Sequence, residues 1–187
     1  MIIYIHGYGG SGEGMKAKIL RKELQDKGII APSLSYVPQL AINTLKELIS
    51  TFSKYEEVYL IGSSLGGYYA TYLADHFNIK AVLLNPSVNP TKTLRKCTQD
   101  APNFFDNSSF KWAENHLEML KNYEVENIKS ELYMLLAQKG DELLDYKEAK
   151  NKFIDSKQII QEGGNHGFEG VEDLIGDMLE FFNIEEK

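Results

Sequence analysis

The sequence predicts an α/β fold, with a doubly wound, mostly parallel sheet of about six strands, helices on both faces and a short helical lid insertion. Short apolar runs alternate with segments of helical periodicity along most of the 187 residues, which is typical of right-handed strand–helix–strand crossovers. Residues 87–128 interrupt this rhythm, because they are too long for one crossover helix, and they give the insertion. No composition break divides the chain, so we expect a single domain over residues 1–187.

The expected strands are short apolar runs of the kind that a sheet buries on both faces. They cover residues 2–5, 29–36, 58–61, 80–84, 132–136 and 156–160. The expected helices carry apolar residues three and four positions apart, and they cover residues 15–25, 40–52, 68–74, 111–123 and 171–182, with a shorter one beginning near Tyr146. Because ligands bind beyond the carboxyl ends of parallel strands, the polar residues that follow these strands are the candidate site residues.

The segment Gly62-Ser63-Ser64-Leu65-Gly66 has the pattern Gly-x-Ser-x-Gly and lies between an expected strand and an expected helix. In this context the pattern indicates a nucleophile elbow, in which the serine has a strained backbone and small neighbours prevent collisions. The pattern alone is weak, because a glycine-rich turn that lets a helix pack closely on a strand also has it. Its context makes Ser64 the candidate nucleophile.

A serine nucleophile needs a base to take its proton, and four histidines are available. His166 lies in a glycine-rich loop directly after the last expected strand, from which it can reach the elbow across the sheet. His76 and His116 fall in amphipathic or charged helical segments, and we expect both at the solvated surface. His6 follows the first strand and is expected to order its loop, with a direct catalytic role as the alternative.

The base in turn needs a carboxylate to orient it. Asp141 follows Gly140 in the turn after the expected strand 132–136, which makes it the first candidate. Asp145 is the alternative, although it is also well placed to cap the helix that begins near Tyr146. The chain order Ser64, Asp141, His166 is the order that accompanies a nucleophile elbow.

Four motifs occur in sequence: Ile3-Tyr4-Ile5-His6-Gly7-Tyr8, Gly62-Ser63-Ser64-Leu65-Gly66-Gly67, Gly140-Asp141-Glu142-Leu143-Leu144-Asp145-Tyr146 and Gly164-Asn165-His166. With them the chain resembles the α/β-hydrolase superfamily and, within it, the small bacterial esterases of the YqiA type. The resemblance implies ester hydrolysis through an acyl-enzyme, with Ser64, Asp141 and His166 at the triad positions. It also implies that the backbone N–H groups of Tyr8 and Leu65 stabilise the oxyanion. The first antiparallel strands of larger members are expected to be missing, since the chain begins at the strand that bears His6.

Composition narrows the classes of partner and cofactor. Twenty basic and 27 acidic residues give a net charge of −7, which argues against nucleic acid or an anionic membrane surface as a main partner. Cys97 is the only cysteine, and we see no signal peptide or membrane-spanning run, so a cytoplasmic protein is expected. The glycine-rich loop 7–12 matches no nucleotide-binding motif, and the histidines lack ligand-like spacing. We therefore expect no cofactor and no metal.

The insertion carries five aromatic residues: Phe104, Phe105, Phe110, Trp112 and Tyr123. They are expected to line an acyl pocket as part of a lid over the elbow, or alternatively to complete the core as an ordinary helix.

The leading functional hypothesis is a carboxylesterase for small acyl esters. A thioesterase or aminoacyl-amide hydrolase with the same triad is an alternative. For a coenzyme A thioester, Lys92, Arg95 and Lys96 could bind the phosphates of the coenzyme. A solvated helix face explains these three residues equally well. A non-catalytic binding protein on a hydrolase fold is the third possibility. The sequence gives no indication of the oligomeric state.

Overall fold

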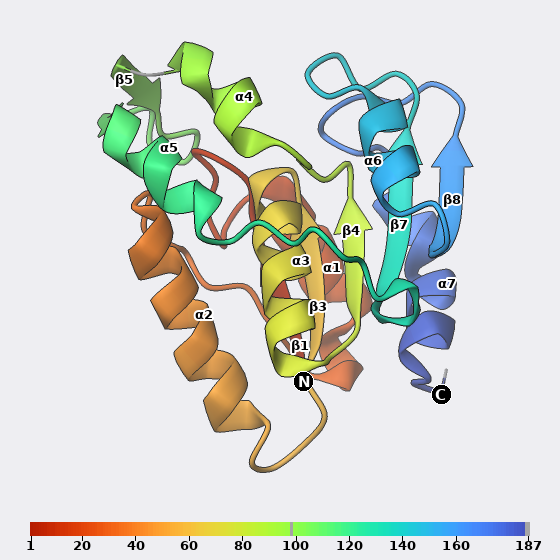
Figure 1. The fold of residues 1–187 in the computed structure, drawn as a ribbon. Coiled ribbons are helices and arrows are strands. Elements are labelled where there is room, and N and C mark those ends of the chain that lie inside the picture. The colour runs from red at the N-terminus through yellow and green to blue at the C-terminus, as the bar shows by residue number, and fades with distance from the viewer. Residues whose placement is uncertain (98, 186–187) are drawn as a thin grey trace.

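A computed structural model describes residues 1–97 and 99–185, and six parallel strands form the main sheet of this part of the chain (Figure 1). The order across the sheet is β2-β1-β3-β4-β7-β8. The strands are β1 (Ile2–Ile5), β2 (Ile29–Ile30), β3 (Tyr59–Ser63), β4 (Ala81–Leu84), β7 (Tyr133–Gln138) and β8 (Lys157–Gln161). The expected doubly wound parallel sheet is confirmed, and the strand that leads into Ser64 lies near its centre.

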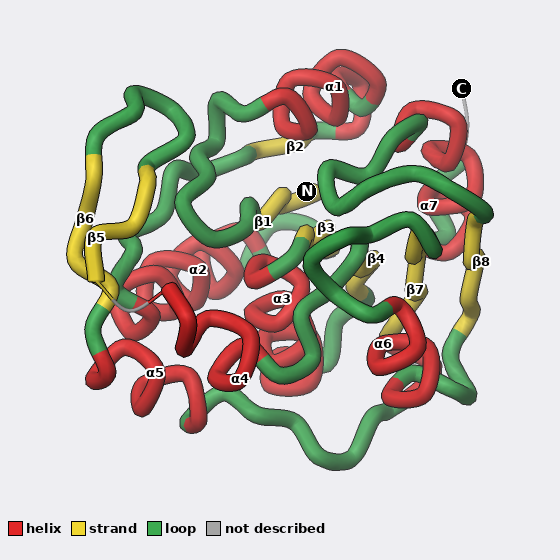
Figure 2. The backbone as a smooth tube through the Cα atoms, turned by 90° about the horizontal axis from the view of Figure 1, so that it is seen from above, coloured by secondary structure: helices red, strands yellow, loops and turns green. Residues whose placement is uncertain are grey.

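Helices cover both faces of the sheet, as the view from above shows (Figure 2). One face carries α1 (Met15–Glu23), η4 (Val171–Leu174) and α7 (Ile175–Phe182), and the other carries α2 (Pro38–Phe52), α3 (Leu65–Phe77) and α6 (Tyr146–Lys152). Side chains of a strand alternate between the faces, so Ile3 and Ile5 join one buried cluster while Ile2 and Tyr4 join the other. Burial on both faces explains why the strands are continuous apolar runs.

Short 3₁₀ turns complete the connections. They are η1 (Gln25–Lys27) after α1 and η3 (Ser130–Leu132) before β7. No helix in the described ranges combines the length and the hydropathy that crossing a bilayer requires.

The second strand is much shorter than expected, because β2 ends at Ile30 whereas the pattern extended it to residue 36. Past this point the backbone forms hydrogen bonds with side chains of α1 and of the loop after β1 instead of with the β1 backbone. The carbonyl of Ala31 accepts from the Arg21 guanidinium at 3.0 Å, and the N–H of Leu34 donates to His6 Nε2 at 3.0 Å. Pro32 has no N–H to continue the ladder.

The insertion between β4 and β7 contains an antiparallel hairpin that the sequence did not predict. The elements of the insertion are α4 (Pro90–Leu94), η2 (Arg95–Cys97), β5 (Gln99–Pro102), β6 (Ser109–Trp112) and α5 (Glu114–Lys121). The hairpin is formed by β5 and β6. The helix expected over 111–123 is therefore wrong at its start, where the chain is still a strand. Figure 1 shows the hairpin and α4 beyond the carboxyl ends of the strands.

The five aromatic residues of the insertion differ in burial. Trp112 and Tyr123 are buried in the core, and Phe110 stacks on Tyr36 with ring centroids 4.7 Å apart. Phe104 and Phe105, in the turn between β5 and β6, are exposed.

The expectation that His116 is a solvated surface residue is wrong. Its side chain on α5 is only 8% exposed, and its ring lies 5.0 Å from that of Trp112. Its Nδ1 accepts the N–H of Ala113 at 3.2 Å, which satisfies a donor at the start of the helix. Burial lowers the pKa of His116, so the packed ring is neutral. His76, by contrast, is exposed as expected.

Candidate active site

Ser64 lies in a sharp turn between β3 and α3. Its backbone has φ 55° and ψ −121°, a conformation that costs a side-chain-bearing residue about 1–3 kcal/mol. Hydrogen bonds impose this geometry: the N–H of Ser64 donates to Leu84 O at 3.1 Å, and its carbonyl accepts from the N–H groups of Gly67 and Ser87, both at 3.0 Å. The strain is therefore held by the end of β4, by the loop after β4 and by the first turn of α3, as in a nucleophile elbow.

Two glycines allow the backbones around Ser64 to approach. A Cβ at Gly66 would lie 2.1 Å from the carbonyl oxygen of Ile5, so only glycine lets the first turn of α3 pack on the end of β1. A Cβ at Gly7 would lie 3.0 Å from Ser64 Cβ, so the loop after β1 passes directly against the serine. These contacts place the His6-Gly7-Tyr8 segment beside the elbow.

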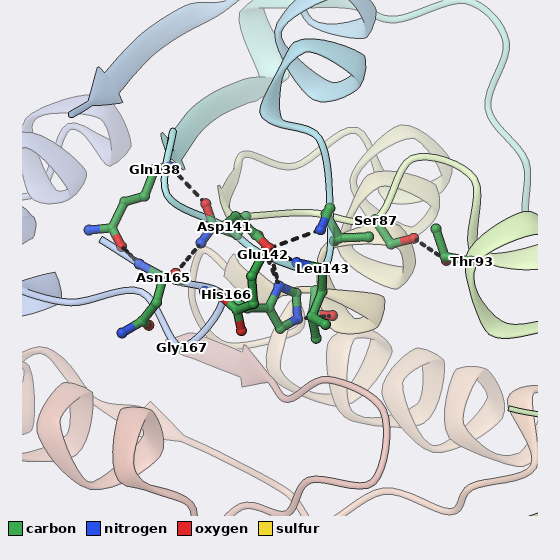
Figure 3. A network of polar contacts seen from close by, with 12 residues as sticks. Ser87, Thr93, Gln138, Asp141, Glu142, Leu143, Asn165, His166 and Gly167 are labelled. Atoms are coloured by element: carbon green, nitrogen blue, oxygen red, sulfur yellow. Dashed lines mark hydrogen bonds and ion pairs between the residues drawn. The ribbon is translucent and has the colours of Figure 1, made fainter. Parts of the chain in front are cut away.

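The structure brings together the three residues that the sequence singled out. His166 Nδ1 lies 2.9 Å from Asp141 Oδ2 (Figure 3). On the other side of the ring, His166 Nε2 lies 3.0 Å from Ser64 Oγ. With the ionised carboxylate as acceptor, Nδ1 carries the ring proton and Nε2 is left to accept from the serine hydroxyl. This is the geometry in which the imidazole can remove the hydroxyl proton.

Asp141 is held in the ionised form by its neighbours. Its side chain is 2% exposed, and burial alone would raise its pKa. The hydrogen bond to His166 and the N–H groups of Leu144 and Leu143, each 2.9 Å from Oδ1, outweigh burial and hold the pKa of Asp141 below its usual value. Asp145 instead accepts the N–H of Lys147 at 2.9 Å as the cap of α6, so the geometry selects Asp141.

Two buried amide side chains, which sequence reasoning missed, hold the loop that carries His166. Gln138 Oε1 accepts the N–H of Asn165 at 3.2 Å (Figure 3). It also accepts the N–H of Glu169 at 3.0 Å, and Gln138 Nε2 donates to Glu169 O at 2.7 Å. Asn85 Nδ2 donates to Asn165 O at 2.9 Å. The residue before His166 is thus held at both its N–H and its carbonyl. The sequence feature that could have indicated this role is an amide side chain directly after an apolar run, as at Asn85 and Gln138.

Two further side chains hold the backbone on either side of the imidazole. Glu142 Oε2 accepts the N–H of His166 at 3.0 Å, and this hydrogen bond lowers the pKa of Glu142. Lys16, in the first turn of α1, donates from Nζ to Gly167 O at 2.7 Å. Burial lowers the pKa of Lys16 to about 8, although the Asp141 charge opposes the shift. The imidazole loop is therefore anchored from β7 and from α1.

Both candidate oxyanion donors line the cavity that contains Ser64. Within the described ranges, no residue accepts a hydrogen bond from the backbone N–H of Tyr8 or of Leu65. Leu65 is the first residue of α3, where N–H groups have no partner inside the helix and the dipole favours negative charge. Both N–H groups are thus available to a ligand oxygen.

His6 orders the loop that carries Tyr8. Its Nδ1 lies 2.8 Å from Gly7 O, and its Nε2 accepts the N–H of Leu34 at 3.0 Å. Burial lowers the pKa of His6, so the ring is neutral. With both nitrogens engaged by backbone, His6 fits the ordering role that the sequence indicated.

A cavity of about 420 Å³ opens at Ser64 and His166, and this volume is typical of small-molecule sites. Most of its other walls are apolar, from the insertion and the turn after β7: Leu94, Ala101, Pro102, Phe104, Leu143 and Leu144. The hydroxyls of Ser87 and Thr93, 3.4 Å apart, add a polar pair.

Two of the three basic residues considered for a phosphate site, Lys92 and Arg95, have acidic partners. Lys92 pairs with Glu148 at 3.0 Å and Arg95 with Glu114 at 2.9 Å, both at the surface. Lys96 lines the cavity. In the part of the chain that the structure describes, no group of three or more His, Cys, Asp or Glu side chains could hold a metal ion.

Solved structures that share this fold include hydrolases. Est1E from Butyrivibrio proteoclasticus, with ferulic acid bound, has a TM-score of 0.74 at 14% identity, and the match covers 97% of this chain and 87% of Est1E. An alpha/beta superfamily hydrolase from Oenococcus oeni PSU-1 has a TM-score of 0.69 at 16% identity, over 97% of this chain and 92% of that one. At such identities the likeness shows the fold alone, and the expected resemblance in fold to α/β hydrolases is confirmed.

Sequence relatives match part or nearly all of the chain. A UPF0227 protein from Shewanella woodyi is 31% identical over 96 residues, which are 48% of this chain and 52% of that protein. The UPF0227 protein VP0969 from Vibrio parahaemolyticus is 24% identical over 188 residues, covering 98% of this chain and 99% of that protein. The family model described as "Uncharacterised protein family (UPF0227)" matches residues 1–183. The chain therefore belongs to the UPF0227 family, built on an α/β-hydrolase fold.

Proposed function

We propose that this protein is a serine hydrolase that cleaves carboxylic esters through an acyl-enzyme, with Ser64, His166 and Asp141 as catalytic residues. The observation that carries the proposal is the unbroken series of hydrogen bonds from Asp141 through His166 to Ser64, at the end of an apolar cavity. Structural triads of this kind are recognised by geometry and roles, and here an elbow, a base and a buried acid occur together.

In the first step, Ser64 Oγ attacks the ester carbonyl carbon while His166 Nε2 takes the hydroxyl proton. The carbonyl π electrons move to oxygen, and the N–H groups of Tyr8 and Leu65 donate hydrogen bonds to the resulting anion. The imidazolium then gives its proton to the alkoxide oxygen as the C–O bond breaks, which releases the alcohol. Water repeats the sequence on the acyl-enzyme and releases the acid.

Asp141 keeps the proton of the neutral imidazole on Nδ1 and stabilises the cation that forms during each step. Its low pKa supports this role, because a carboxylate that stays ionised at neutral pH offers a full negative charge to the imidazolium. The insertion, residues 87–128, supplies α4 and the hairpin at one wall of the cavity, which supports a lid-like role within a single domain.

A small-molecule ester is the substrate class that the cavity supports best. The same residues are chemically competent toward thioesters and aminoacyl amides. However, Lys92 and Arg95 already form ion pairs with carboxylates. This favours a phosphate site at these two residues less than unpaired cations would. A purely binding role does not account for the strained serine, because such strain is stored where function requires it.

The test compares hydrolysis of p-nitrophenyl butyrate by wild type and by Ser64→Ala. We expect Ser64→Ala to lower kcat by about 10⁴-fold or more with an unchanged unfolding transition. Ser156→Ala is the matched control. This partly buried serine directly precedes the edge strand β8 and does not line the cavity, so the variant should keep wild-type kcat. Substantial activity in Ser64→Ala would eliminate the proposed mechanism.

A further inference from the structure

Two large apolar side chains at the cavity are left in solvent. Phe104, between β5 and β6, is 67% exposed, and Leu143, in the turn after β7, is 57% exposed. Both line the cavity that holds Ser64 and His166, although they come from segments far apart in the sequence. Exposed apolar area that gathers at a concave site marks a binding surface, because covering it is favourable.

Each of these residues is fixed to a segment that carries a reacting group. The N–H of Phe104 donates to Gly9 O at 2.9 Å, directly after Tyr8. A Cβ at Gly9 would lie 2.5 Å from Pro102 O, so the hairpin docks tightly on this loop. The N–H of Leu143 donates to Asp141 Oδ1 at 2.9 Å. The backbone of each residue is therefore fixed relative to the segment that carries Tyr8 or to Asp141, which places both side chains at the cavity.

The cavity wall beside Phe104 and Leu143 is suited to bind a hydrocarbon group, because it is mostly apolar. Leu94, Ala101 and Leu144 line the same cavity, and its volume of about 420 Å³ is larger than an acetyl group requires. The charged residues that line it, Lys96 and Asp100, are exposed side chains, as is expected at its solvent side. A group that fills this space gains by removing apolar surface from water.

We propose that Phe104 and Leu143 are specificity-determining residues that clamp the apolar group of the substrate, so that the preferred substrates are esters bearing an alkyl chain of several carbons or an aryl group. This inference rests on the proposed function and refines the expectation of small acyl esters. The apolar group belongs either to the acyl half or to the alcohol half of the ester. In both cases Phe104 and Leu143 would cover apolar surface in the same way.

Two substrate series distinguish the halves. The acyl series is ethyl acetate, ethyl butyrate and ethyl hexanoate, and the alcohol series is ethyl acetate and phenyl acetate, each followed by acid release in a pH-stat. For the half that the clamp holds, we expect Phe104→Ala and Leu143→Ala each to lower kcat/KM for the larger member by about 5–10-fold, as removal of buried apolar area implies. For ethyl acetate we expect a change below about twofold.

Phe105→Ala is the matched control. Phe105 is 64% exposed on the same turn but does not line the cavity, so this variant should match wild type on every ester. Equal losses for ethyl acetate and for the larger esters in Phe104→Ala, or an equal loss in Phe105→Ala, would overturn the clamp.

A binding measurement separates this inference from the proposed function. Phenyl hexanoate is titrated calorimetrically into Ser64→Ala and into the double variants Ser64→Ala/Phe104→Ala and Ser64→Ala/Phe105→Ala. We expect Kd to rise about 5–10-fold with Phe104→Ala and to stay unchanged with Phe105→Ala. If Kd changes in this way but the wild-type protein hydrolyses no ester, the proposed esterase function is refuted and the clamp is retained. Equal Kd values in all three proteins would refute the clamp.

Discussion

Replacing Gln138 by leucine tests whether the imidazole loop depends on a buried amide. The substitution keeps the side chain's approximate size but removes the acceptor of two loop N–H groups, those of Asn165 and Glu169, and the donor to Glu169 O. A buried polar group that loses its partner costs about 1–3 kcal/mol, so the two N–H groups alone give about 2–6 kcal/mol if the loop stays in place. The loop can avoid this cost by moving toward water, and His166 then moves with it.

We therefore expect Gln138→Leu either to lower the free energy of unfolding by about 2–6 kcal/mol or to lower kcat, because a shift of about 1 Å in a catalytic group costs about 10²-fold. Urea unfolding and ester hydrolysis on the same preparation measure both. Gln158→Leu is the control, because its amide donates to Lys150 O and Phe153 O and, among the described residues, makes no hydrogen bond with this loop. Wild-type stability together with wild-type kcat in Gln138→Leu would refute this reasoning.

Three further predictions concern the acid, a partly buried lysine and the elbow. Asp141→Asn should lower kcat by about 10⁴-fold while Asp145→Asn keeps wild-type kcat, and similar losses in both variants would contradict the assignment. The folded-state pKa of Lys16 is about 8 against an ordinary 10.5, so between these pH values the unfolded chain binds more protons and stability rises with pH. Urea unfolding at pH 8 and pH 10 should show this rise in wild type and a smaller one in Lys16→Met. Gly66→Ala, whose Cβ would lie 2.1 Å from Ile5 O, should abolish activity or folding, and a variant with wild-type kcat and unfolding midpoint would show that the elbow tolerates a side chain.

The parts of the site that could be predicted from sequence are those with local causes. Ser64 was identifiable because an elbow needs a strand, a serine between small residues and a helix within one short segment. His166 and Asp141 followed because parallel strands end at one edge of the sheet, so residues after different strands meet there.

The parts that sequence reasoning missed depend on contacts between distant segments. The partners of Asn85 and Gln138 lie on the loop after β8, and no local pattern shows that these amides face it. Trp112 was read as part of a helix, yet pairing of β6 with β5 makes it a strand residue. His116 looked solvated because its neighbours are charged, and the ring of Trp112 buries it.

The central claim is that Ser64 is a nucleophile activated by His166. Its most direct test is intact-protein and peptide mass spectrometry after incubation with a fluorophosphonate. We expect a single adduct on the peptide that contains Ser64, at a rate that His166→Ala lowers by about 10³-fold or more. An unlabelled Ser64, or labelling that is equally fast without His166, would contradict the account.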